Sequence, residues 1–183
     1  MAKVKYVPPE SDSPDSVAAR PVDTALFRDV VGRFATGVLV ATTRSGGVDH
    51  AMTVNAFTSV SLDPLLVLIC AERISRFRDA VLDAGTWAVS VLSAEALEHA
   101  ERFAVRGRPI NGRLSEIPHH PGPHTALPIL DQALAAVECE TYAVHDGGDH
   151  DIVVGRVLGV STPDGDAAPL IYHGGRYRRL HAD

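Results

Sequence analysis

The chain has 183 residues, of which 45% are hydrophobic and 22% charged, and its formal net charge is −6 at pH 7. This length suits one domain. The mean hydropathy of +0.05, with no apolar run of membrane-spanning length, argues against a membrane protein. The acidic balance argues against a nucleic-acid-binding surface. We therefore expect one domain over residues 23–183, in a protein that binds neither nucleic acid nor membrane.

The first residues of the chain and the two cysteines bear on its cellular location. Residues 1–22 are rich in Pro, Ser and Asp and predict a disordered or surface-draped tail, because they have little apolar area to bury. Its first ten residues, M-A-K-V-K-Y-V-P-P-E, lack the apolar stretch of a secretory signal. Cys70 and Cys139 both lie in apolar, strand-like runs, which indicates buried free thiols in a reducing compartment. We expect a cytoplasmic protein.

The first element of the domain is predicted to be a helix. Asp23 or Thr24 can cap its start, and apolar residues recur at helical spacing as far as Phe34. We expect Gly37 to end this helix. Residues 38–43 then read as a strand, and the Ser-Gly-Gly sequence at 45–47 predicts a hairpin turn.

The segment 50–71, H-A-M-T-V-N-A-F-T-S-V-S-L-D-P-L-L-V-L-I-C-A, is the most informative stretch. Small polar and apolar residues alternate in its first half, and an apolar run of strand length follows the turn at Asp63-Pro64. A purely structural strand would carry bulkier hydrophobic residues. The small hydrogen-bonding side chains suit a surface on which a flat polar ligand lies close to the backbone. An ordinary pair of half-exposed strands would have the same pattern.

A second helix is predicted directly after this stretch. Ser75 is a good N-cap, and Gly85 is expected to end the helix. The start of a helix attracts phosphate through its backbone N–H groups, and Arg76 adds a positive charge there. A simply capped surface helix is the alternative interpretation of the same residues.

The rest of the chain alternates strands with turns. Residues 86–92 read as a strand and Ser93 as the cap of another helix, while 105–127 form a long Pro-, Gly- and His-rich loop of the kind that often has a functional role. Hairpins are predicted over 133–160 and 169–180. Hairpin-linked strands with a few short helices indicate a mostly β, antiparallel barrel. No G-x-G-x-x-G follows a strand, so a nicotinamide cofactor would not be held as in a Rossmann fold.

Several motifs resemble those of one family. They are M-T-V-N-A-F-T-S-V-S-L-D-P-L-L-V-L-I-C, F-R-D-V-V-G-R-F-A-T-G-V-L-V-A-T-T, the R-F-A of residues 102–104 and the G-D-H of residues 148–150. Together, over about residues 27–180, they resemble the flavin reductase family, which has a split-barrel flavin-binding fold. The sequence departs from the family pattern at Pro64-Leu65, where two prolines are usual, and in the loop, where Ile110, Gly112 and Leu114 match only loosely.

The resemblance implies an NAD(P)H:flavin oxidoreductase. Such an enzyme transfers a hydride from nicotinamide C4 to N5 of FMN or FAD, and supplies reduced flavin to a flavin-dependent monooxygenase. The cofactors perform this chemistry while the protein binds and orients them, so we expect no catalytic side chain. The family resemblance also implies a homodimer. The sequence leaves open FMN or FAD, NADH or NADPH, and the identity of the monooxygenase.

The same resemblance assigns the binding residues. Backbone N–H groups near residues 53–55 are expected at the pyrimidine edge of the flavin, where charge develops on reduction. Ser75 and Arg76 are expected at its phosphate. The full set expected at the flavin is Thr36, Thr53, Val54, Asn55, Ser59, Val60, Ser61, Cys70, Ala71, Ser75, Arg76, Phe103 and Arg106. The set expected at the nicotinamide is His150, Tyr172, His173 and Tyr177.

Two other functions are compatible with parts of the sequence. Histidines at 119, 120, 124, 145 and 150 suggest a metal site, but most lie among prolines in a loop without fixed ligand geometry, and we predict no metal. A flavin- or haem-binding split barrel without reductase activity would be a carrier or a sensor. The G-D-H motif favours the reductase.

Overall fold

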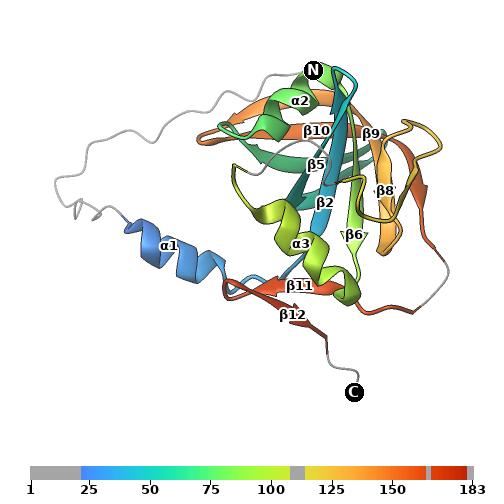
Figure 1. Cartoon of the computed structure of the whole chain (residues 1–183). Coiled ribbons are helices and arrows are strands. Elements are labelled where there is room, and N and C mark those ends of the chain that lie inside the picture. Colours follow the sequence, from blue (N-terminus) through green and yellow to red (C-terminus); the bar gives the residue numbers. More distant parts are fainter. Residues whose placement is uncertain (1–21, 108–113, 164–165, 181–183) are drawn as a thin grey trace, which may run out of the picture.

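The computed structural model describes residues 22–107, 114–163 and 166–180 and shows a mostly β, antiparallel split barrel (Figure 1). The tail predicted over residues 1–22 lies outside the described residues, apart from Val22. One seven-stranded sheet has the order β3-β2-β6-β9-β10-β5-β4, and all its pairs are antiparallel. Its strands are β2 (Leu39–Ser45), β3 (Val48–Val54), β4 (Phe57–Leu62), β5 (Leu65–Glu72), β6 (Thr86–Leu92), β9 (Ala133–Gly147) and β10 (His150–Ser161).

The two edges of this sheet are consecutive in the chain. β3 stands at one end of the strand order and β4 at the other, and only residues 55–56 connect them. The sheet therefore curls until its edges approach each other, but β3 and β4 do not pair. This opening leaves β3 as an edge strand of the sheet, and the cavity described below lies along it.

Smaller elements complete the fold. A ribbon of β1 (Thr36–Gly37), β11 (Leu170–His173) and β12 (Arg176–Arg179) lies beside the barrel. The loop predicted over residues 105–127 contains β7 (His119–Pro121), which pairs with β8 (Pro128–Leu130) directly after the loop. The helices are α1 (Thr24–Val31), α2 (Arg76–Ala84) and α3 (Leu97–Ala104), with a 3₁₀ turn η1 (Ala94–Ala96) before α3. None of the helices in the described ranges is long and apolar enough to cross a membrane.

The core has two main parts, because β2 is buried on both faces. Leu39 and Ala41 point into the barrel, where they pack with Trp87 of β6 and with Phe77 of α2. Val38 and Val40 face outward, where α3 covers them. Alternate strand residues point to opposite faces, so a strand with an unbroken apolar run needs cover on both sides. In this fold α2 covers one end of the barrel and α3 covers its outer wall (Figure 1).

Local signals determine α2, as predicted. The Ser75 hydroxyl accepts a hydrogen bond from the Arg78 backbone N–H at 3.2 Å. Gly85 ends the helix in the left-handed conformation with φ 68°, where a residue without Cβ is not strained. The apolar residues of the helix, Phe77 and Val81, face the barrel interior. Of the two residues predicted as possible N-caps of α1, Asp23 and Thr24, Asp23 is the cap.

Two helix boundaries were predicted incorrectly. α1 ends at Val31 with Gly32 as its C-cap, not at Gly37, because Thr36 and Gly37 instead pair with β11. Ser93 opens the 3₁₀ turn, but its side chain makes no capping hydrogen bond, and α3 starts only at Leu97. The hairpins predicted over 133–160 and 169–180 are confirmed as β9–β10 and β11–β12, with β9 extending to Gly147.

Candidate functional site

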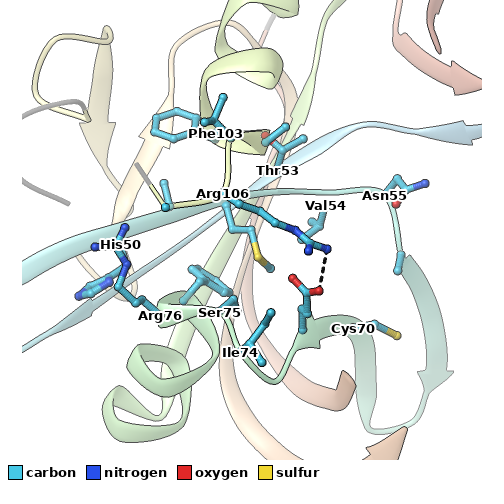
Figure 2. Close-up of a pocket in the computed structure, with 18 of the residues that line it drawn as sticks. His50, Thr53, Val54, Asn55, Cys70, Ile74, Ser75, Arg76, Phe103 and Arg106 are labelled. Carbon is cyan, nitrogen blue, oxygen red and sulfur yellow. Dashed lines mark hydrogen bonds and ion pairs between the residues drawn. The ribbon is translucent and has the colours of Figure 1, made fainter. Parts of the chain in front are cut away.

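A cavity of about 620 Å³ opens beside β3 (Figure 2). This volume lies in the range of small-molecule and cofactor sites. Its walls come from β3 with the two residues after it, the end of β5 with the loop into α2, the start of α2, and the end of α3, while His150 contributes from the start of β10. Segments far apart in the sequence therefore meet around one space.

One long wall of the cavity is β3 itself. Because β3 is an edge strand, the backbone groups on the side away from β2 have no strand partner in the sheet. Every residue from Asp49 to Ala56 lines the cavity, so backbone as well as side chains face it. An edge of this kind presents N–H and C=O groups in a row, which suits the hydrogen-bonding edge of a flat heterocycle.

The polar side chains predicted at the end of β3 are partly engaged within the protein. The Thr53 hydroxyl donates to the Ala100 carbonyl of α3 at 2.7 Å, which attaches the helix to the strand. The Asn55 amide donates to the Thr36 hydroxyl at 3.4 Å, and Asn55 is exposed at the cavity mouth. Thr36 therefore contacts a wall residue but does not itself line the cavity.

The start of α2 forms the positively charged end of the cavity. Ser75, Arg76 and Phe77 line it, and the His50 side chain of β3 lies near Arg76 (Figure 2). Burial lowers the pKa of His50, and the positive charge of Arg76 lowers it further, against a smaller opposite effect of Asp49. A helix N-terminus with the positive charge of Arg76 beside it is a suitable seat for a phosphate, and the largely neutral His50 ring can donate a hydrogen bond there.

Arg106 approaches the cavity from the segment after α3. Its guanidinium Nη2 lies 2.7 Å from Glu72 Oε1, and the dashed line in Figure 2 marks this ion pair. The Arg106 side chain is 78% exposed and that of Glu72 is 23% exposed, so water screens the pair on the arginine side. The pair links the segment after α3 to the end of β5.

His150 lines the cavity from the start of β10, directly after the β9–β10 turn. Its Nδ1 lies 2.7 Å from Asp149 Oδ1, and this hydrogen bond lowers the pKa of the Asp149 carboxyl, with the His150 charge adding to the effect. His150 is the cross-strand partner of Glu72 in β5. Gly148, with φ 80°, makes the tight turn that brings the ring to this position.

The two cysteines differ in burial. Cys139 is fully buried, and burial raises the pKa of its thiol to about 12, with the charge of Glu138 contributing. Cys70 was expected to be buried but is only half-buried, because its side of β5 faces the cavity. Burial raises the pKa of this thiol too.

The structure brings together most of the residues predicted from the sequence. Those that line the cavity are Thr53, Val54, Asn55, Cys70, Ser75, Arg76, Phe103, Arg106 and His150. Ser59, Val60 and Ser61 do not, because they lie on β4 at the other edge of the sheet. Ala71 is fully buried in the barrel core.

The other residues predicted for the nicotinamide lie apart from the cavity. Tyr172, His173 and Tyr177 belong to the β11–β12 ribbon. The two tyrosine rings meet edge to face at 5.4 Å between centroids, and both pack against the outer core cluster. Within the single described chain they therefore have a packing role, and their role at a nicotinamide stays a prediction.

Sequence reasoning missed part of the lining. His50, Met52 and Ile74 were not assigned to the site, although His50 and Met52 share a strand face with the predicted Val54. Because alternate residues of a strand share a face, the assignment of Val54 to the site could have been extended to His50. Glu72 gave no signal, because its role depends on Arg106, which reaches it from the segment after α3.

In the described ranges, no group of three or more His, Cys, Asp or Glu side chains is placed to hold a metal ion. Three of the five histidines considered for such a site, His119, His120 and His150, have hydrogen-bond partners of their own. His119 Nδ1, for example, lies 2.7 Å from the Ile117 carbonyl, and His120 Nδ1 lies 2.7 Å from Asp131.

The fold is an antiparallel split barrel, and a cavity large enough for a cofactor lies at its open edge. These two features together define a cofactor-binding split-barrel protein. Residues 31–181 match the model of the flavin reductase like domain, and the chain belongs to this family. The chain is 40% identical over 154 residues to the FMN reductase (NADH) SmoA of Agrobacterium fabrum, covering 84% of each. It is 35% identical over 168 residues to the reductase subunit HsaB of a flavin-dependent monooxygenase of Rhodococcus jostii, covering 92% of this chain and 84% of HsaB.

Solved structures agree with this assignment. The fold matches BorF, the flavin reductase component of a bacterial two-component tryptophan halogenase, with a TM-score of 0.82 and 38% identity, over 88% of this chain and 100% of BorF. It also matches the NADH:FAD oxidoreductase SgcE6 of Streptomyces globisporus in complex with NAD and FAD fragments. That TM-score is 0.81 at 34% identity, over 88% of this chain and 94% of SgcE6.

Proposed function

We propose that this protein is an NADH-dependent flavin reductase that supplies reduced FMN or FAD to a separate flavin-dependent monooxygenase. The observation that carries the proposal is that the basic start of α2 and the G-D-H histidine, His150, line one cavity. The start of α2 suits the phosphate of a flavin, and His150 suits a second ligand beside the flavin. The names of SmoA, HsaB and SgcE6 point to the same activity.

The residues present fit a flavin. The cavity has the edge strand β3 beside the polar edge of a flat ring, an apolar surface from Met52 and the buried Phe103, and a basic helix start for a phosphate. When bound, flavin accepts a hydride from the nicotinamide, and this chemistry belongs to the two cofactors. The protein contributes binding, orientation and exclusion of water.

Individual residues take these tasks. Backbone groups of β3 near residues 53–55 hold the pyrimidine edge, and Ser75 with Arg76 holds the phosphate. His150 contacts the nicotinamide, and its bond to Asp149 limits the rotation of the ring. In this assignment no side chain acts as an acid or a nucleophile.

We further propose a homodimer in the cytoplasm. Helix α1 has no buried residue, and the side chains of Leu26, Phe27, Val30 and Val31 are more than half exposed along one face. An exposed apolar face of this size is typical of an obligate interface. Two cysteines without a disulfide agree with a reducing compartment.

The deciding experiment mixes purified protein with FMN and NADH under anaerobic conditions. A reductase bleaches the flavin absorbance and consumes the nicotinamide band together, with one NADH oxidised for each flavin reduced. A carrier or sensor binds FMN, as flavin fluorescence would report, but leaves NADH intact. Repeating the assay with FAD and with NADPH determines both preferences from kcat/KM.

A further inference from the structure

Asp151 is a buried carboxylate directly next to His150. The two residues are neighbours on β10, so their side chains point to opposite faces of the strand. His150 faces the cavity, whereas Asp151 is only 4% exposed and lies under the loop between β5 and α2. A charge in such a position requires partners to offset the loss of hydration.

Two arginines supply these partners, Arg73 from that loop and Arg78 from the first turn of α2. Arg73 Nε donates to Asp151 Oδ1 at 3.0 Å, and Arg78 Nε donates to Asp151 Oδ2 at 2.6 Å. The bond from Arg78 lowers the pKa of Asp151 most, and the bond and charge of Arg73 lower it further, against the opposing effect of burial. The carboxylate is therefore ionised at neutral pH and uses both oxygens.

The arginines extend this attachment to both ends of the cavity. Arg73 Nη2 also donates to Asp146 Oδ2 at 2.6 Å, and its backbone N–H donates to the Asp149 carbonyl at 3.0 Å. Arg78 is the residue whose backbone N–H the Ser75 hydroxyl caps. One arginine thus holds the His150 turn, and the other belongs to the first turn of α2.

We propose that Asp151 is a positioning residue that fixes the phosphate end of the cavity, at Ser75 and Arg76, relative to His150. This inference rests on the proposed function. Asp151, Arg73 and Arg78 are outside the set of described residues that line the cavity. They act through Ser75, Arg76 and His150, so that flavin and nicotinamide affinities depend on the same buried contact.

The test replaces the charge and keeps the shape, with the variant Asp151→Asn. Its matched control is Glu138→Gln, because Glu138 is also 4% exposed and accepts hydrogen bonds from Thr125, away from the cavity. Three quantities are measured for each protein: the Kd for FMN by fluorescence titration, the KM for NADH, and Tm.

We expect Asp151→Asn to raise both the Kd for FMN and the KM for NADH by about five- to thirtyfold, a usual range for coupling between sites. Glu138→Gln is expected to lower Tm while both constants stay within about twofold of wild type. Unchanged constants in Asp151→Asn, or the same rise in Glu138→Gln, would overturn the proposal, because the effect would be absent or merely structural.

A second variant serves if Asp151→Asn does not fold. Arg73→Lys keeps the charge on a side chain that is 40% exposed, but a single ammonium cannot reproduce the fork that reaches Asp151 and Asp146. Its control is Arg156→Lys. This variant alters the ion pair between Arg156 of β10 and Glu140 of β9, on the hairpin that also carries His150. We expect a raised KM for NADH in the first variant alone, and an unchanged KM would overturn the proposal.

Failure of the proposed function gives a different result. Wild-type protein that binds FMN but does not oxidise NADH would refute the reductase activity. The flavin titration would then still test the positioning role, because it needs no turnover.

Discussion

The indole ring of Trp87 lies so close to the backbone of Gly155 that a side chain at residue 155 would overlap it. A Cβ built on Gly155 would also lie 2.8 Å from Cβ of Cys139, closer than real Cβ contacts. Trp87 and Cys139 are both fully buried. Gly155 thus lets β10 pass over the largest side chain of the barrel core, at a point where its pairing with β9 shifts register.

The first prediction follows from this contact. Gly155→Ala is expected to destabilise the fold by about 1–3 kcal/mol, because the core must shift to admit one methyl group. Urea denaturation followed by Trp87 fluorescence measures the change. Gly37→Ala is the control, since nothing lies within 4 Å of its Cβ position. Equal stability of the two variants would contradict the prediction.

The second prediction concerns the phosphate. Arg76→Ala is expected to weaken FMN binding by about ten- to a hundredfold, because a charge-assisted hydrogen bond contributes about 1.5–3 kcal/mol. Riboflavin, which lacks the phosphate, should bind almost as to wild type. Titration of both flavins, with Arg156→Ala as a variant outside the cavity, separates the contributions. An equal loss for both flavins would place the phosphate elsewhere.

His150 is the subject of the third prediction. His150→Ala should leave the Kd for FMN nearly unchanged and raise the KM for NADH by about two- to tenfold, equivalent to one contact of about 0.5–1.5 kcal/mol. Loss of alignment would lower kcat as well. Flavin titration beside steady-state kinetics measures both, with His145→Ala on the same hairpin as the control. Normal NADH kinetics would remove His150 from the mechanism.

The fourth prediction concerns acid. Arg78 and Arg73 hold the pKa of Asp151 below its ordinary value of 3.8. The stabilisation from this charge is complete well above 3.8, and it is lost as the pH falls through the lower pKa of the folded state. The difference in Tm between wild type and Asp151→Asn should therefore be constant above about pH 5 and shrink below about pH 4. A difference that does not change with pH would show that ionisation of Asp151 contributes nothing.

The fifth prediction tests the role of α1. Phe27 is 58% exposed on the apolar face of the helix. Phe27→Glu is expected to raise the dissociation constant of a dimer at least about tenfold, as for a residue central to an interface. Sedimentation velocity over a concentration series measures it. Arg28→Gln changes the net charge by the same amount on the same helix and should have little effect. A wild-type monomer at micromolar concentration would refute the dimer.

Short-range signals account for what could be predicted from the sequence. The helix between Ser75 and Gly85 was predicted at both ends, because its cap and its stop depend only on residues within the helix or next to it. The hairpin turn before His150 was predicted for the same reason. The family motifs located the cavity wall at residues 53–55 and 75–76.

Long-range pairing accounts for the errors. The end of α1 was placed too late, because Thr36 and Gly37 leave the helix to pair with residues 171–172, more than a hundred positions away. Ser59 is close to Asn55 in sequence, yet the open seam puts it on the opposite edge of the sheet, so its contact with flavin stays a prediction. Nothing local in the sequence indicates which side of a seam a residue occupies. The contacts of each cavity residue with flavin remain predictions.

Helix α1 has only eight residues and stands apart from the barrel, close to the β11–β12 ribbon (Figure 1). The Gly174 N–H donates to the Gly32 carbonyl at 2.8 Å just beyond its end. A helix of this length is only marginally stable in water without tertiary packing. Its order therefore depends on the surface that covers its apolar face. If that surface is a second subunit, folding of the first ten residues of the domain is part of assembly, and dilution should reduce the helical circular dichroism signal while the barrel stays folded.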